Sequence, residues 1–155
     1  MKSDLKEKLK FSAYILATNP ESGYEGVVYT QDAIIEFKNS QRAIVSDFFM
    51  FCTADMVGTT REIVLSMLVH SLAKMEIKTV GISPDPSMPS IDIKGCVDEI
   101  IVPDDPQKAE RQHAAIVDFG IGKVLIDIDK KYFHLHLKAG DCVRVNGRVD
   151  LVSIE

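Results

Sequence analysis

Residues 113–154 read HAAIVDFGIGKVLIDIDKKYFHLHLKAGDCVRVNGRVDLVSI, and this stretch decides the expected fold. Two apolar runs flank Gly120-Ile121-Gly122, and two more meet at Asn146-Gly147. Glycine and asparagine supply the positive φ that tight connections need, so the pattern predicts two successive β-hairpins. A three-residue connection through Arg148 keeps the apolar side chains of the second hairpin on one face, and we expect Arg148 near the tip of that loop.

The composition predicts a globular cytoplasmic protein. The chain has 155 residues, of which 46% are hydrophobic and 26% charged, enough for one core or two small ones. Its apolar runs are shorter than the roughly 20 residues that a membrane span needs, and its start lacks a secretory apolar segment. Cys52, Cys96 and Cys142 are 44 and 46 residues apart, which suits neither a disulfide framework nor a zinc knuckle. We expect three buried, reduced thiols.

The N-terminal half contains the clearest helical pattern. Thr59 and Glu62 have the spacing of a capping box, and apolar side chains follow at helical intervals up to Met75. Ile63 and Val69 lie outside that stripe, which predicts a helix covered on two sides, by a sheet and by another element or a second copy of the chain. Strands are expected at 47–52 and 77–82, and also earlier in the chain at 11–17, 26–29, 30–37 and 42–45. The range 30–37 also fits a helix.

A proline cluster divides the chain. Three prolines fall within residues 83–89, and such stretches are typical of linkers. The expected organisation is an α/β region at 1–83, a linker at 84–89 and a β-rich domain at 90–155.

The last part of the chain resembles a known family. Its five predicted strands, with a connecting segment at 130–137 between the third and fourth, follow the order of an OB-fold barrel, and they are 91–102, 114–119, 123–129, 141–146 and 149–154. The sequence motifs of this segment resemble those of OB-fold nucleic-acid-binding domains at three places, Ile93–Val97, Ile116–Val124 and Leu137–Val149. The fold class expected is therefore α+β, an N-terminal α/β region with one long buried helix followed by a small five-stranded OB-like β-barrel.

The resemblance implies a non-enzymatic protein that binds single-stranded DNA or RNA. Such a groove uses aromatic rings to stack bases and cations to contact phosphates, and the candidates here are Phe119, Tyr132, Lys123, Lys131, Arg144 and Arg148. No catalytic residue and no cofactor is predicted. The net charge is −5, with nine basic and eleven acidic residues in 1–89 and nine and twelve in 90–155, so binding depends on a local cationic patch.

Two other functions fit the same sequence. An OB-like module can instead serve as a structural or oligomerisation piece that binds protein partners, including a second copy in a homodimer. A small-ligand or metal-binding barrel is the third hypothesis, because His134 and His136 share a face if the segment is extended. Two ligands leave a metal's coordination incomplete, so no metal site is assigned to this pair.

Overall fold

The computed structural model describes residues 1–25 and 27–155, and of residues 21–24 and 27–29 it describes the backbone alone. Within this part of the chain, nine strands form one mixed sheet with four short helical segments. In chain order the elements are α1 (Ser3–Leu9), β1 (Phe11–Tyr24), β2 (Val27–Glu36), β3 (Arg42–Asp47), η1 (Ala54–Met56), β4 (Thr60–Met75), β5 (Gly81–Pro84), β6 (Ser90–Ile101), α2 (Pro106–Ala109), β7 (Gln112–Asp118), β8 (Lys123–Asp129), η2 (Lys130–Leu135) and β9 (Cys142–Ile154).

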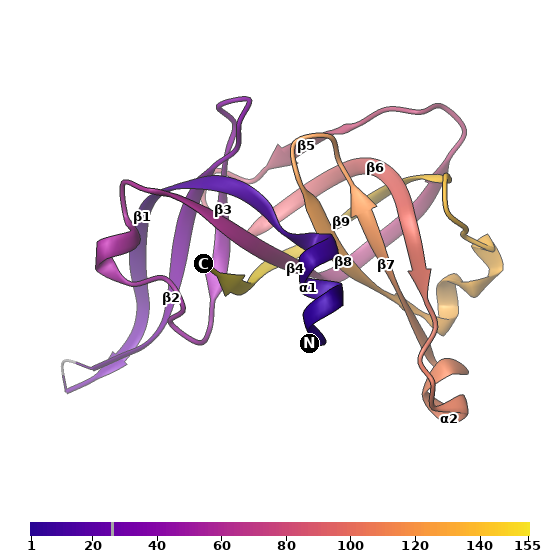
Figure 1. The fold of residues 1–155 in the computed structure, drawn as a ribbon, viewed down its shortest axis with the longest axis horizontal. Coiled ribbons are helices and arrows are strands. Elements are labelled where there is room, and N and C mark those ends of the chain that lie inside the picture. Colours follow the sequence, from indigo (N-terminus) through magenta and orange to yellow (C-terminus); the bar gives the residue numbers. More distant parts are fainter. Residues whose placement is uncertain (26) are drawn as a thin grey trace.

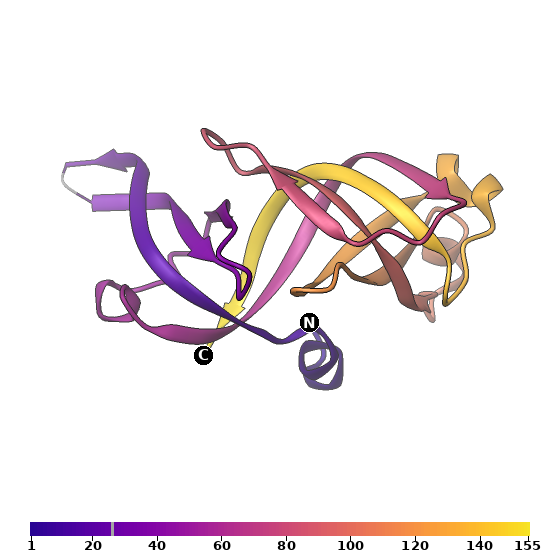
Figure 2. The same cartoon turned by 90° about the horizontal axis from the view of Figure 1, so that it is seen from above.

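The sheet closes on itself twice. Its order is β1-β2-β3-β9-β4-β8-β7-β6-β5, and the further pairings β1–β4 and β9–β6 complete one ring from β1, β2, β3, β9 and β4 and another from β6, β7, β8, β4 and β9. Figures 1 and 2 show β1–β3 at one end of the molecule and β6–β8 at the other, with the long strands β4 and β9 running between them. Both rings therefore depend on the same central pair.

The two rings repeat one pattern of pairing. In the first, β1 pairs antiparallel with β4 and β3 runs parallel to β9; in the second, β6 pairs antiparallel with β9 and β8 runs parallel to β4. The chain is thus arranged as two four-strand halves, β1–β4 and β6–β9, whose last strands pair with each other and contribute to both rings. The parallel contacts are short, one residue pair for β3–β9 and two for β4–β8.

The predicted fold class is wrong. The long helix expected from Thr59 onward is strand β4, and the expected capping pair does not form, since Thr59 Oγ1 donates to Met56 O at 2.5 Å. Residues 90–155 supply four strands rather than five, because the two expected at 141–146 and 149–154 are one continuous β9. Their ring needs β4 from the other half, so this segment is not a five-stranded barrel.

Some strand predictions are confirmed. The expected strands at 91–102, 114–119 and 123–129 correspond to β6, β7 and β8. The expected linker at 84–89 begins at the last residue of β5 and leads into β6. A division of the chain at this linker remains a prediction. Strand β4 before the linker pairs with β9 after it, from Ile63↔Ile154 to Met75↔Cys142.

The core follows the same arrangement. One buried cluster extends through both rings and includes Ile15, Val45, Leu65, Val117 and Val145, each between 0% and 2% exposed. Removing such side chains from water is the main stabilising term of a fold of this kind. A second, smaller cluster forms where α1 lies against the outer side of the sheet (Figure 2), and its buried members are Leu9, Val64 and Ile116.

Candidate functional site

Phe119, expected to stack a base, belongs to the core. Its ring is 1% exposed and packs edge-on against Phe11 and Phe37, with centroid separations of 6.1 and 5.9 Å. A stacking residue must offer an open ring face. Phe119 has none, so we remove it from the candidate site.

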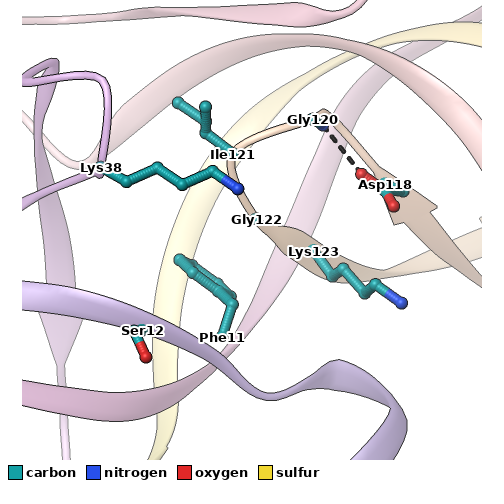
Figure 3. A pocket seen from close by; sticks show the side chains of 8 residues that line it. All are labelled: Phe11, Ser12, Lys38, Asp118, Gly120, Ile121, Gly122 and Lys123. Carbon is teal, nitrogen blue, oxygen red and sulfur yellow. Dashed lines mark hydrogen bonds between the residues drawn. The ribbon is translucent and has the colours of Figure 1, made fainter.

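Lys123 lies beside the β7–β8 turn, in a pocket of about 390 Å³. Figure 3 shows the Lys38 side chain reaching toward this turn, while the Lys123 ammonium points away from the pocket. The Lys123 Nζ atom is 3.1 Å from Asp98 Oδ2, and Asp118 Oδ1 accepts the Gly120 N–H at 2.8 Å. The charge of Lys123 is therefore already compensated by a carboxylate.

The positive charges of Arg144 and Arg148 are compensated in the same way. Arg144 donates through Nε and Nη2 to Asp92 at distances down to 2.6 Å, and Arg148 donates to both oxygens of Asp150 at 2.8 and 3.0 Å. The guanidinium of Arg148 also lies 4.7 Å from the centroid of the Phe48 ring. Both side chains make bidentate ion pairs, which leave little net charge for a phosphate.

The remaining candidates come together on η2. This 3-10 helix follows β8 and ends at Leu135. The next residue, His136, has a left-handed φ of 48° and donates its N–H to Phe133 O at 3.1 Å. The helix turns Tyr132 and Phe133 against the core, while Lys131 and His134 are exposed. The expected extended His134-Leu135-His136 segment is wrong, because the chain is helical through Leu135.

Beside η2 is a pocket of about 510 Å³, which we call the η2 pocket. It is lined by Ile100, Val102, His113, Ile128, Tyr132, Phe133, His136 and Leu137. The His113 ring stacks on Phe133 with centroids 4.2 Å apart and planes 21° from parallel. Val102 is 54% exposed, so the pocket is an open apolar recess with aromatic and imidazole side chains at its wall. Such a recess suits a flat ring.

A lysine lies beside the tyrosine that lines the η2 pocket. The Lys131 ammonium lies 5.1 Å from the centroid of Tyr132, and the Tyr132 hydroxyl donates to His70 O at 3.5 Å. No carboxylate among the described side chains, those of residues 1–20, 25 and 30–155, is within ion-pair distance of the Lys130 or Lys131 ammonium. This is the place where the predicted ring and cations meet without compensating acids. Across the same residues, no group of three His, Cys, Asp or Glu side chains is placed to hold a metal ion.

One exposed feature, Phe48–Phe51, is not predicted by the sequence pattern, and we call it the aromatic loop. The expectation of an interior strand at 47–52 is wrong, because β3 ends at Asp47 and Phe49 is 77% exposed. The Phe49 and Phe51 rings lie 5.6 Å apart. The signal available was Asp47 itself, since aspartate at a strand end commonly accepts the amides of a following turn.

Comparison of the chain with protein-family models and with curated proteins finds no match. None of the helices in the described part of the chain is long and apolar enough to cross a membrane.

Proposed function

We propose that this chain is a non-enzymatic cytoplasmic protein that binds single-stranded DNA or RNA at the η2 pocket. One observation carries the proposal: Tyr132 lines an open apolar recess, and the ammonium of Lys131, which makes no ion pair with a described side chain, lies 5.1 Å from the centroid of its ring. Base stacking and phosphate contacts are the two interactions that single-stranded binding sites combine.

In this proposal each group has a role. A base enters the recess and packs against the Tyr132 ring, while Lys130 and Lys131 contact the phosphates on either side of it. The hydrogen bond from Tyr132 to His70 O fixes the ring against β4, which lowers the entropy lost on binding. With few uncompensated lysines and a net charge of −5, we expect a footprint of a few nucleotides and a shallow salt dependence, with a log–log slope of about −1.4 for two contacts.

Fluorescence anisotropy with labelled oligonucleotides at low salt tests the proposal. Tyr132→Ala should weaken binding on the order of 5- to 100-fold, the range for loss of one stacking residue. Lys131→Gln should weaken it a few-fold and reduce the magnitude of the salt slope by about 0.7. Lys38→Gln is the matched control, since Lys38 is also exposed and lines a different pocket. The proposal fails if the wild type does not bind at tens of micromolar protein, or if Lys38→Gln has the same effect as Lys131→Gln.

A second candidate function is self-association through the aromatic loop. Phe48 and Phe51 are each 38% exposed and flank the more exposed Phe49. Exposed aromatic clusters are typical centres of protein interfaces. The adjacent charges, Arg148 and Asp150, neutralise each other, so two acidic copies can approach at this loop without a local charge penalty. The occupant we infer is a second copy of the chain, with the two loops packed across a twofold axis.

Sedimentation equilibrium separates this candidate from the first. We expect a dimer in the wild type and a monomer with Phe49→Ser, whereas Val102→Ser, at another exposed apolar position, should leave the dimer intact. A monomeric wild type at 100 µM rules self-association out and leaves the nucleic-acid proposal unaffected.

A further inference from the structure

Cys96 and Cys142 face each other on neighbouring strands. They are partners in the antiparallel register of β6 with β9, and their Sγ atoms are 3.9 Å apart. Their neighbours Val97 and Val143 are 2% and 0% exposed and point into the core, whereas both cysteines are half-buried on the outer side of the sheet. The sequence expectation of buried thiols therefore holds for Cys52 alone.

The backbone at this point has the spacing of a disulfide. Val97 N–H donates to Asp141 O and Gly140 N–H donates to Val97 O, each at 2.8 Å. Hydrogen-bonded and non-hydrogen-bonded pairs alternate along two antiparallel strands. Cys96 and Cys142 form the pair next to Val97 and Asp141, so they occupy a non-hydrogen-bonded position, where Cα atoms lie about 4.5 Å apart. Disulfides span Cα separations of about 4.4–6.8 Å. Side-chain rotation is then enough to bring the sulfurs from 3.9 Å to bonding distance.

The two thiols differ in access. Cys142 lines an open recess of about 640 Å³ together with Lys74, Glu76 and Asp141. Cys96 pairs with Cys142 on β9 and with Asp118 on β7, and it does not line that recess. Burial, the contact with Cys142 and the Asp118 carboxylate raise the pKa of Cys96, and Lys78 acts in the opposite direction. Cys142 is thus the sulfur that an incoming reagent meets first.

We propose that Cys96 and Cys142 form a reversible dithiol site that reacts with low-molecular-weight disulfides such as glutathione disulfide. The Cys142 thiolate attacks one sulfur of the reagent, forms a mixed disulfide and releases one thiolate. Cys96 then loses its proton to solvent and attacks the Cys142 sulfur, which releases the second thiolate and closes the bond between β6 and β9. Two protein thiols become one disulfide and the reagent is reduced to two thiols, the stoichiometry of thiol–disulfide exchange. Bonds of this kind in cytoplasmic proteins are usually transient or redox-sensing.

Intact-mass analysis of the full chain after incubation with glutathione disulfide tests the site. We expect the wild type to lose the mass of two hydrogen atoms and to retain one thiol, Cys52, which is 3% exposed and alkylated only after denaturation. Cys96→Ser should stop at a stable glutathione adduct on Cys142, because the resolving thiol is gone. Cys52→Ser is the matched control and should still close the bond.

Stability gives a second readout. The bond would join positions 96 and 142, which are 46 apart in the chain, so the oxidised protein should unfold at a temperature on the order of 5–10 °C higher than the reduced protein. The proposal is wrong if the wild type keeps three free thiols, if it stops at a glutathione adduct, or if it forms disulfides only between chains. Oligonucleotide binding and self-association are measured separately under reducing conditions, so their outcomes do not affect this one.

Discussion

Gln31 and Asp47 are joined inside the protein by a hydrogen bond of 2.7 Å from Nε2 to Oδ2. The same amide donates to Cys52 O at 2.8 Å, and the Asp47 carboxylate accepts the N–H groups of Phe51 and Cys52 at 2.8 and 2.9 Å. Asp47 is 0% exposed. A side chain on β2 and a buried carboxylate on β3 therefore fix the turn that holds the aromatic loop in the solvent.

The first prediction concerns this carboxylate. Asp47→Ala removes one of the two acceptors of the Gln31 amide and leaves the N–H groups of Phe51 and Cys52 without theirs. Each buried donor that loses its partner costs about 1–3 kcal/mol. We expect the free energy of unfolding in urea to fall by about 3 kcal/mol. Glu36→Ala, which removes the ion pair with Arg42 at the surface, should change it by less than about 1 kcal/mol. Equal losses in the two variants would show that Asp47 does not hold the turn.

The second prediction concerns the crossing of β4 and β9. A Cβ atom at Gly147 would lie 2.1 Å from Leu68 O and 3.0 Å from Met67 Cγ. Since backbone atoms cannot move aside, Gly147→Ala should lower the free energy of unfolding by more than about 3 kcal/mol. Gly140→Ala is the control, because Gly140 has a φ of +94° and nothing within 4 Å of its Cβ position, so backbone strain alone should cost it about 1–2 kcal/mol. Chemical denaturation of both proteins checks this. A smaller loss of unfolding free energy for Gly147→Ala than for Gly140→Ala would contradict the close contact between Gly147 and Leu68.

The same residue explains one failure of the sequence analysis. The dipeptide Asn146-Gly147 is typical of a tight turn. Gly147 nevertheless lies in the middle of β9, opposite Val69 on β4 and Ile91 on β6. Glycine is needed there for close approach of another backbone rather than for positive φ. Sequence shows which residues lack a side chain, but the reason depends on a strand more than 70 residues away.

The wrong prediction of a helix from Thr59 to Met75 has a similar cause. Strand β4 serves two rings, so its buried residues do not alternate simply: Ile63, Val64 and Leu65 are all buried, Val64 beneath α1 and the other two in the main core. Register shifts at Val64/Leu65 and Val69/Ser71 then move the buried face by one residue. The resulting apolar spacing imitates a helical stripe. By contrast, β7 and β8 belong to one ring, and their boundaries were predictable.

For the candidate site, the sequence identified the η2 residues Lys131 and Tyr132 but not the partners that compensate the other cations. Arg144 reaches Asp92, which is 52 positions away in the chain, and this pairing follows only from the register of β6 with β9. Ion pairs that depend on strand register cannot be predicted from the sequence before the register is known.

The third prediction concerns pH. Burial raises the pKa of the Cys52 thiol above its ordinary value of 9.0, Asp47 and Asp55 raise it further, and Arg61 lowers it. Above about pH 9 the unfolded chain loses this proton while the folded protein keeps it, so the free energy of unfolding falls as pH rises. Below that pH both states retain the proton and the contribution is constant.

Urea unfolding between about pH 8 and 10.5, with a reductant present, checks this. The free energy of unfolding should decline more steeply with pH in the wild type than in Cys52→Ala, in which every other titrating group is retained. Parallel declines in the two proteins would mean that the Cys52 thiol titrates normally in the folded state.

The last prediction concerns the ion pair between Arg144 and Asp92. Their side chains are 57% and 22% exposed, and exposed pairs contribute little because water screens the charges and ordering two side chains costs entropy. A double-mutant cycle with Arg144→Gln and Asp92→Asn should give a small coupling energy, which decreases with added salt. The pair between Lys8 and Glu99, 53% and 42% exposed, provides a reference cycle of lower expected coupling. A coupling energy well above that of the reference pair and independent of salt would contradict this, and would mean that Asp92 holds Arg144 more tightly than a surface ion pair does.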